Sequence, residues 1–246
     1  MLGLGEAGSR IASDLVAAGA EVSGYDPADV DVEGVTGAPD VPAAVRECDV
    51  VLSLNAARVA LDVAVAALPG LADGTVYADL NTGSPELKRS IAVLAEEARA
   101  PFADVALLGP VPGRGLRTPA LASGAGAQAF ADALRPLGMP VDVVSDQAGD
   151  AAAMKLVRSV FMKGLAAAAI ESVEAADAAG HADWLKGEIA AVIGEPFLER
   201  LLEGSRTHAA RRVDEMEAAR DLLLALGVEP RIAEASAAVL AHLASS

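Results

Sequence analysis

Three glycines near the start of the chain, Gly3, Gly5 and Gly8, have the spacing of a turn that binds the phosphates of a dinucleotide. In such a turn the first glycine permits a tight bend, the second leaves room for a pyrophosphate, and the third lets a helix pack closely on a strand. Glu6 and Ala7 open the helix that follows, whose free N–H groups and positive end attract phosphate. These five residues are therefore predicted to bind a dinucleotide cofactor.

Asp26 is predicted to recognise the adenosine ribose of that cofactor. It follows the strand-like run 21–25 and lies eighteen residues after Gly8, where an acidic residue accepts hydrogen bonds from ribose hydroxyls. A carboxylate suits a free 2′-hydroxyl and repels a 2′-phosphate, and residues 27–31 contain no lysine or arginine. We therefore predict NAD as the cofactor, with NADP less favoured. The alternative is that Asp26 only caps the next turn.

Lys155 has surroundings that would suit a lysine that transfers a proton. Hydride transfer between an alcohol and a carbonyl requires a group that takes or returns the hydroxyl proton. Residues 151–154 are apolar, and apolar surroundings favour the neutral amine that can take this proton. We predict Lys155 as the catalytic acid/base. The alternative is a surface lysine whose aliphatic stem lies along an amphipathic helix.

Ser159 and Lys163 follow Lys155 by four and eight residues, so a helix would place all three on one face. Ser159 can hydrogen-bond a substrate oxygen. Lys163 either holds an anionic group of the substrate or faces water, and the sequence leaves both open. Both residues are predicted substrate contacts.

Asn55 and Asn81 each end a predicted strand. In open α/β sheets ligands bind at the carboxyl ends of the strands. We predict Asn55 near the ribose on the nicotinamide side and Asn81 near the nicotinamide itself. Each of them is otherwise an ordinary turn residue.

The elements that must position these side chains follow from the order of sequence patterns. Strand-like runs alternate with helix-like runs through the first half, which favours a mostly parallel sheet with helices on both faces. The strand-like runs are 21–25, 49–54, 75–78, 102–108, 120–122 and 141–144. From about residue 149 only helical patterns remain: 150–178, interrupted at Gly164, then 182–192, 196–203, 207–226 and a last run to 243.

We therefore predict an α/β fold class, a Rossmann-type doubly wound sheet in residues 1–147 followed by an all-α domain in residues 148–246. Only Met1 and Leu2 precede Gly3, which is short for a central first strand, so we expect the natural chain to begin upstream.

Composition excludes several classes of function. The formal net charge of −16 disfavours nucleic acid and anionic membranes as partners. The single cysteine, Cys48, excludes a disulfide framework and a cysteine-rich metal site, and we predict no metal. No apolar run reaches the roughly 18 residues of a membrane span, and no signal segment opens the chain. We therefore expect a cytoplasmic protein.

The motifs together resemble the superfamily of β-hydroxyacid dehydrogenases and 6-phosphogluconate dehydrogenase. Within it, the chain is most similar to a branch of NAD-binding oxidoreductases with a distinct C-terminal all-α domain. The resembling segments are residues 3–8, 79–85, 109–113, 155–164 and 210–216. The resemblance implies that Lys155 is the catalytic lysine on a long helix and that an all-α domain closes the site.

Two positions depart from the superfamily pattern. Ser159 stands where β-hydroxyacid enzymes have asparagine, and Pro112 stands where they have a serine that binds the substrate carboxylate. Proline offers neither a hydroxyl nor an N–H group. The loop would then bind substrate through the backbone of Gly113 and Arg114, or through the charges of Arg114 and Arg117. These departures argue against a simple β-hydroxyacid as substrate.

Four polar residues at spacings of three and four, His208, Arg211, Arg212 and Glu215, share the predicted helix 207–226. We expect Glu215 to pair with Arg211 or Arg212. The resemblance leaves open a role for this helix in closing the site, across a subunit interface if the protein is oligomeric.

The sequence thus predicts an NAD(P)-dependent dehydrogenase or reductase acting on the CH–OH group of a small hydroxy acid, sugar acid or related alcohol or carbonyl compound. The alternatives are a non-catalytic NAD-binding sensor and an imine reductase-like enzyme. Imine reductases of the superfamily usually lack the lysine, so Lys155 favours alcohol–carbonyl chemistry. A homodimer formed by the C-terminal helices is expected, because the alanine-rich segment 150–178 is too long for the rest of its domain to cover.

Overall fold

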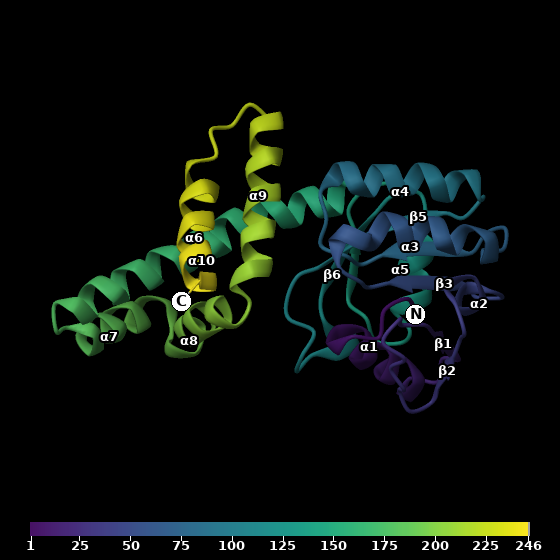
Figure 1. Ribbon diagram of the computed structural model, residues 1–246, viewed down its shortest axis with the longest axis horizontal. Helices are drawn as coiled ribbons and strands as arrows, with labels where there is room; N and C mark the ends of the chain where they lie inside the picture. Colours follow the sequence, from purple (N-terminus) through teal and green to yellow (C-terminus); the bar gives the residue numbers. More distant parts are fainter. Residues whose placement is uncertain (246) are drawn as a thin grey trace. The chain divides into compact units, whose positions relative to one another are not determined.

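The computed structural model describes residues 1–245 and divides into two compact units, Met1–Ala153 and Met154–Ser246 (Figure 1). The first unit is a sheet covered by helices, and the second consists of helices. This arrangement confirms the predicted fold class. No helix among the described residues is long and apolar enough to cross a membrane.

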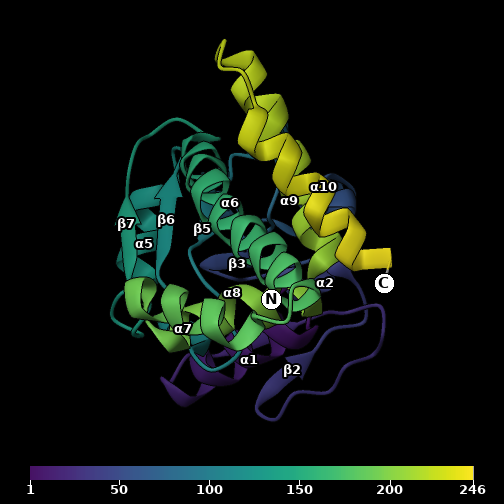
Figure 2. The same ribbon diagram turned by 90° about the vertical axis from the view of Figure 1, so that its left-hand side faces the viewer.

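In the sheet of the first unit, all pairs of neighbouring strands are parallel except one. Its strands are β1 (Val22–Gly24), β2 (Val35–Gly37), β3 (Val50–Ser53), β4 (Val76–Asp79), β5 (Phe102–Leu107), β6 (Ala120–Ser123) and β7 (Val141–Val143). β1 pairs with β2, and β3 to β7 pair in chain order, with β5 and β6 antiparallel (Figure 2). β2 was not among the predicted strands, because its three residues are half-buried or exposed and carry no clear alternation.

Residues 1–3 join the two groups of strands. Leu2 forms parallel bridges with both Tyr25 and Ser53. Its N–H donates to the Leu52 carbonyl at 2.8 Å, and the Gly3 N–H donates to the Tyr25 carbonyl at 2.9 Å. The short first strand therefore makes the hydrogen bonds of a central strand, and β2, β1, β3 and the rest form one continuous sheet.

Helices cover both faces of the sheet. They are α1 (Glu6–Ala17), α2 (Val41–Val45), α3 (Ala60–Ala67), α4 (Pro85–Glu97) and α5 (Ala127–Leu134), with 3₁₀ turns at Ala57–Val59, Leu68–Gly70 and Gly115–Arg117. The apolar side chains of α1 and α5 pack on one face, against residues such as Val105. Those of α2, α3 and α4 pack on the other, against residues such as Tyr77. The alternation of strand side chains supplies both cores.

Within the described residues, up to 245, the second unit contains five helices. They are α6 (Asp150–Ala178), α7 (Ala182–Ile193), α8 (Glu195–Thr207), α9 (Ala209–Ala225) and α10 (Arg231–Ser245). α9 and α10 lie side by side, as do α7 and α8 (Figures 1 and 2). The core formed by α6, α9 and α10 contains Leu156, Met216, Ala219 and Leu240.

Helix α6 has the predicted bounds but continues through Gly164 without interruption. A Cβ at Gly164 would lie 2.7 Å from the Ile232 side chain of α10. This glycine therefore allows close packing of two helices rather than ending one. The first turn of α6 belongs to the sheet unit, because the Ala151 and Ala152 N–H groups hydrogen-bond to side chains of β6 and β5.

Candidate functional site

The three glycines of the opening turn have different surroundings. Gly3 has φ of +93°, and a Cβ there would overlap the Leu54 carbonyl oxygen. A Cβ at Gly8 would overlap the Gly3 carbonyl oxygen. At Gly5, the N-cap of α1, a Cβ would meet nothing within 4 Å. Gly3 and Gly8 are thus required by the fold, whereas Gly5 leaves open space at a helix N-terminus, which fits an approaching pyrophosphate.

Asp26 is held beside this turn. One carboxylate oxygen accepts the Leu4 N–H at 2.7 Å, and the other accepts the Ala28 N–H at 2.9 Å. The second bond is the turn cap of the alternative interpretation. The first bond places the half-buried carboxylate next to the glycine turn, as ribose recognition requires.

Asn55 and Asn81 lie together at the carboxyl ends of β3 and β4. The Asn55 N–H donates to the Asn81 Oδ1 atom. The Asn55 side-chain amide donates to Ser53 Oγ at 2.9 Å, and the Asn81 amide donates to Asp79 Oδ1. These partners fix the orientations of both amides on the sheet edge where ligands bind in this fold.

The segment 109–119 is attached to α1. Asp14 accepts the Leu116 N–H at 2.9 Å and pairs with Arg10 at 3.2 Å. The three residues predicted to contact substrate, Pro112, Gly113 and Arg114, are all exposed, and Gly113 has φ of +83°. The sheet unit thus exposes this loop, but the predicted use of the Arg114 backbone is wrong, because its N–H donates to the Val111 carbonyl at 3.0 Å.

In the helical unit, Ser159 and Lys163 of α6 meet Glu215 of α9. The Lys163 Nζ atom lies 2.8 Å from Glu215 Oε1 and 3.2 Å from Ser159 Oγ, and the Ser159 hydroxyl donates to the same carboxylate oxygen. The expected pairing of Glu215 with Arg211 or Arg212 is therefore wrong. Lys155 is close enough to influence the Glu215 charge. Lys163 and Ser159 of one helix face thus contact one carboxylate, and the charge of Lys155 lowers the pKa of the same group.

The reason for this correction is helix packing. On α9 alone, the i+4 and i+3 neighbours favour Arg211 and Arg212, but α6 packs against α9 and brings Lys163 closer. The Arg212 guanidinium instead donates to Ser205 Oγ at 2.5 Å. Lys163, which was expected either to hold a substrate anion or to face water, has 15% of its side chain exposed and is ion-paired.

The charge states in this cluster follow from burial and proximity. Burial alone would raise the pKa of Glu215, but the charges of Lys163 and Lys155 and the two hydrogen bonds outweigh it and lower that pKa below 4.5. Burial lowers the pKa of Lys163, and the attraction of Glu215 offsets only part of this effect. Glu215 is therefore a carboxylate at neutral pH.

We predict that Glu215→Gln destabilises the protein by about 3 kcal/mol at pH 7, because it leaves the Lys163 charge buried without its partner. The stabilisation due to a lowered carboxyl pKa is complete above the ordinary value and is lost as pH falls through the folded-state value. The difference in unfolding free energy between wild type and variant should therefore shrink below about pH 4.5.

Urea unfolding from pH 3 to 8 measures this difference. Glu217→Gln, an exposed change on the same helix, is the matched control and should have little effect. A Glu215→Gln protein as stable as wild type at pH 7 would contradict the assigned ion pair.

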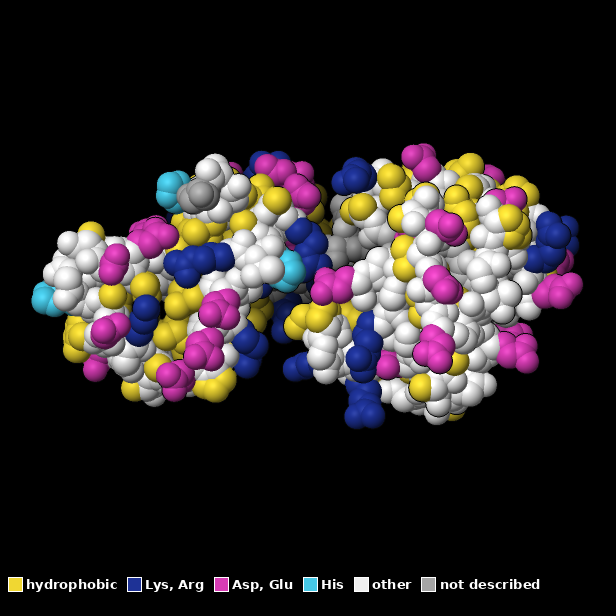
Figure 3. Space-filling view, turned by 60° about the horizontal axis from the view of Figure 1, so that its bottom comes forward, with side chains coloured by type: hydrophobic (Ala, Val, Ile, Leu, Met, Phe, Trp, Pro, Cys, Tyr) yellow, Lys and Arg dark blue, Asp and Glu magenta, His cyan; other side chains and the backbone are white. Residues whose placement is uncertain are grey.

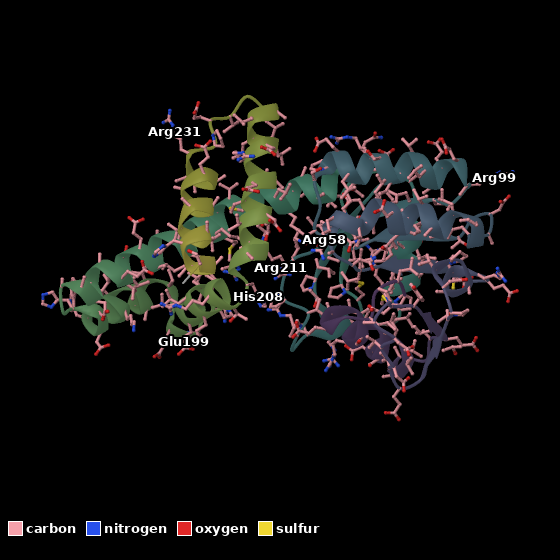
Figure 4. All side chains as sticks on the ribbon, viewed as in Figure 1. Arg58, Arg99, Glu199, His208, Arg211 and Arg231 are labelled. Atoms are coloured by element: carbon pink, nitrogen blue, oxygen red, sulfur yellow. The ribbon has the colours of Figure 1, made fainter. Side chains whose placement is uncertain are left out.

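His208 and Arg211 lie at the start of α9, exposed to solvent (Figure 4). His208 is the residue between α8 and α9, and Arg211 is one turn further along.

The sheet unit also contains a buried ionic cluster that was not predicted from the sequence. Lys88 of α4 lies between Asp79 of β4 and Asp104 of β5, and all three side chains are at most 1% exposed. The sequence feature that could have indicated this cluster is an acidic residue in each of two otherwise apolar strands, 76–79 and 102–107. Charged groups at such positions require partners.

Two family descriptions match the chain. Residues 1–139 match "NAD binding domain of 6-phosphogluconate dehydrogenase", and residues 176–243 match "Domain of unknown function (DUF1932)". The first match covers the glycine turn, Asp26 and both asparagines. The second covers α7 to α10 but begins after Lys155, Ser159 and Lys163.

Individual relatives agree with these matches. An uncharacterised 28.5 kDa protein of Methanothermus fervidus is 27% identical over 202 residues, which cover 81% of this chain and 77% of the relative. The solved conserved protein MTH1747, described as structurally similar to 3-hydroxyacid dehydrogenases, is 30% identical with a TM-score of 0.77, over 98% of this chain and 95% of the other.

Mycobacterium tuberculosis 3-hydroxyisobutyrate dehydrogenase has a TM-score of 0.83 over the whole of this chain and 92% of its own. Its identity to this chain is 22%, so the similarity concerns the fold.

Proposed function

Because this chain belongs to the family of the NAD-binding domain of 6-phosphogluconate dehydrogenase, we propose that it is an NAD(P)-dependent oxidoreductase with Lys155 as general acid/base. Its substrate is a small hydroxy acid, sugar acid or related alcohol or carbonyl compound. The observation that carries the proposal is the glycine turn, whose first and third glycines are required by packing while the second leaves open space at the N-terminus of α1.

The residues of the turn fit the cofactor. The N–H groups at the start of α1 would hold the pyrophosphate, Asp26 the adenosine ribose, and Asn55 and Asn81 the nicotinamide end. When bound, the nicotinamide accepts a hydride from the alcohol carbon or supplies one to the carbonyl carbon.

Lys155 takes the proton of the substrate hydroxyl during oxidation and returns it to the carbonyl oxygen during reduction. Gly113 would contribute a backbone N–H group and Arg114 a cation to the substrate, with Pro112 beside them in the loop and Ser159 as a hydroxyl contact. Lys163 acts through Glu215 and Ser159, since its charge is already paired.

The test is a screen of hydroxy acids, sugar acids and aldehydes for absorbance change of NADH and NADPH. A non-catalytic sensor would bind cofactor and turn over none of these compounds. An imine reductase-like enzyme would consume cofactor with cyclic imines and leave the alcohols untouched. Turnover of an alcohol or carbonyl compound that depends on Lys155 supports the proposal against both.

We predict that NAD binds more tightly than NADP and that Asp26→Ser reduces or reverses this difference in affinity. The carboxylate next to Leu4 N–H would repel a 2′-phosphate, and serine removes that repulsion while it retains a hydrogen-bonding group. Calorimetric titration of wild type and variant with both cofactors measures the preference. Equal affinities in wild type would contradict the role assigned to Asp26.

We further propose a homodimer formed by the C-terminal helices. Large apolar side chains of this unit are exposed, with Phe161 at 67%, Trp184 at 66% and Val192 at 84%, and Figure 3 shows hydrophobic side chains exposed among charged ones. Exposed apolar groups of this kind favour association.

Light scattering should give twice the chain mass for wild type, and Phe161→Asp or Trp184→Glu should shift it toward the monomer with little loss of monomer stability. Arg200→Asp, a change of charge on α8, is the control. A monomeric wild type at micromolar concentration would rule out the dimer.

A further inference from the structure

Lys88 is a charged residue buried on the sheet side of α4. Its Nζ atom donates to the Asp79 carbonyl at 2.8 Å and lies 2.9 Å from Asp79 Oδ2 and 3.3 Å from Asp104 Oδ1. A single ammonium group therefore connects two neighbouring parallel strands, β4 and β5, at the middle of the sheet.

Asp104 extends this cluster to the start of α6. Its Oδ2 atom accepts the Ala152 N–H at 3.0 Å and the Ser123 hydroxyl at 3.1 Å, and Ser123 Oγ accepts the Ala151 N–H at 3.0 Å. The Asp104 carboxylate thus lies at the positive end of the long helix. Ala152 precedes Lys155 by three residues on that helix.

Asp79 extends the cluster in the other direction. Its Oδ1 atom accepts the backbone N–H of Asn81 at 3.2 Å and also the Asn81 side-chain amide. The Asn81 side-chain oxygen in turn accepts the Asn55 N–H. A continuous chain of polar contacts therefore runs from the two asparagines to the first turn of α6, and Lys88 is its central link.

A buried ionic cluster of this kind is expected to contribute little to the stability of the sheet. Moving three charged groups out of water opposes folding, and well-packed apolar side chains of similar volume often stabilise as much or more. Each contact of the cluster instead fixes the direction of a polar group: an asparagine amide, a strand carboxylate, or the N–H groups of a helix end. The cluster is therefore suited to holding these polar groups in fixed orientations.

We propose that Lys88 is a positioning residue that couples the cofactor-side asparagines, Asn55 and Asn81, to the first turn of α6. The inference rests on the proposed function, because it takes these asparagines to contact the nicotinamide end of the cofactor. Binding there would be transmitted through Asp79, Lys88 and Asp104 to the helix that carries Lys155.

The experiment compares wild type with Lys88→Met and with the double variant Lys88→Met/Asp79→Asn, using NADH and NADPH as probes. Lys88→Met removes the ammonium group and leaves both Asp79 and Asp104 buried without their counter-charge, so both melting temperature and cofactor affinity should fall. The double variant removes one of these two uncompensated charges, so its melting temperature should recover in part. Its dissociation constant should remain raised by at least about 10-fold, because the ammonium group and the carboxylate that orient Asn81 are both absent.

Hydrogen exchange of the Ala151 and Ala152 N–H groups is the second readout. In wild type, NADH should slow their exchange, and in both variants this protection should be absent. Ser123→Ala, a mild change that removes only one hydroxyl of the chain, should fold normally and lose the protection at Ala151. Lys186→Met, an exposed lysine change on α7, should behave as wild type in every assay.

These outcomes distinguish the proposed positioning role of Lys88 from a purely structural role. Recovery of both melting temperature and NADH affinity in the double variant would mean that Lys88 is only structural. Unchanged protection at Ala151 in a folded Ser123→Ala protein would equally overturn the coupling. If wild type binds neither NADH nor NADPH, the proposed function itself fails, and this inference fails with it.

Discussion

Lys155→Met is expected to reduce turnover by about 10² to 10⁴-fold while leaving the affinity for NADH within a few-fold of wild type. Methionine keeps the length and apolar character of the side chain but cannot exchange a proton. Because Lys155 lies on α6, away from the glycine turn in sequence, its loss leaves the α1 N-terminus and Asp26 intact.

Steady-state kinetics on the substrate identified by screening, with NADH fluorescence for binding, measures both quantities. Lys186→Met is the matched control, since it removes an exposed lysine of the same unit. If turnover of Lys155→Met stays near that of wild type, the base lies elsewhere in the chain. The cofactor site would be unaffected by that result.

Gly5→Val is expected to weaken cofactor binding by about 100-fold, equivalent to about 2.7 kcal/mol, with an unchanged melting temperature. The backbone of Gly5, with φ of −63° and ψ of −171°, suits any residue, and a Cβ there meets no protein atom within 4 Å. The side chain would instead occupy the open space that the pyrophosphate needs. Fluorescence titration with NADH and thermal melting test the two halves of this expectation.

Gly8→Val is the matched comparison on the same turn. A Cβ at Gly8 would overlap the Gly3 carbonyl, so this variant should fail to fold or lose several kcal/mol of stability. The two variants together distinguish a glycine kept for ligand approach from one kept for packing. Undiminished NADH binding by folded Gly5→Val would show that the phosphates lie elsewhere.

Much of this protein was determined locally by its sequence. The order of strands and helices, the bounds of α6 and the glycine turn all follow from periodicity, caps and backbone conformation, which involve residues close together in the chain. The same is true of the face shared by Ser159 and Lys163, because helix geometry alone places residues four apart together.

The partners of the charged residues were decided only by the tertiary structure. Glu215 had two arginines at favourable spacing on its own helix, yet it pairs with Lys163 because α6 packs against α9. Lys88 has the sequence setting of an ordinary residue on an amphipathic helix, and only the packing of α4 on β4 and β5 brings it between two aspartates. Likewise, the two residues before Gly3 form a central strand because both neighbours supply hydrogen bonds. Local patterns specify which elements form, whereas long-range packing specifies which polar groups meet, since a buried charge takes whichever partner the assembled core places within reach.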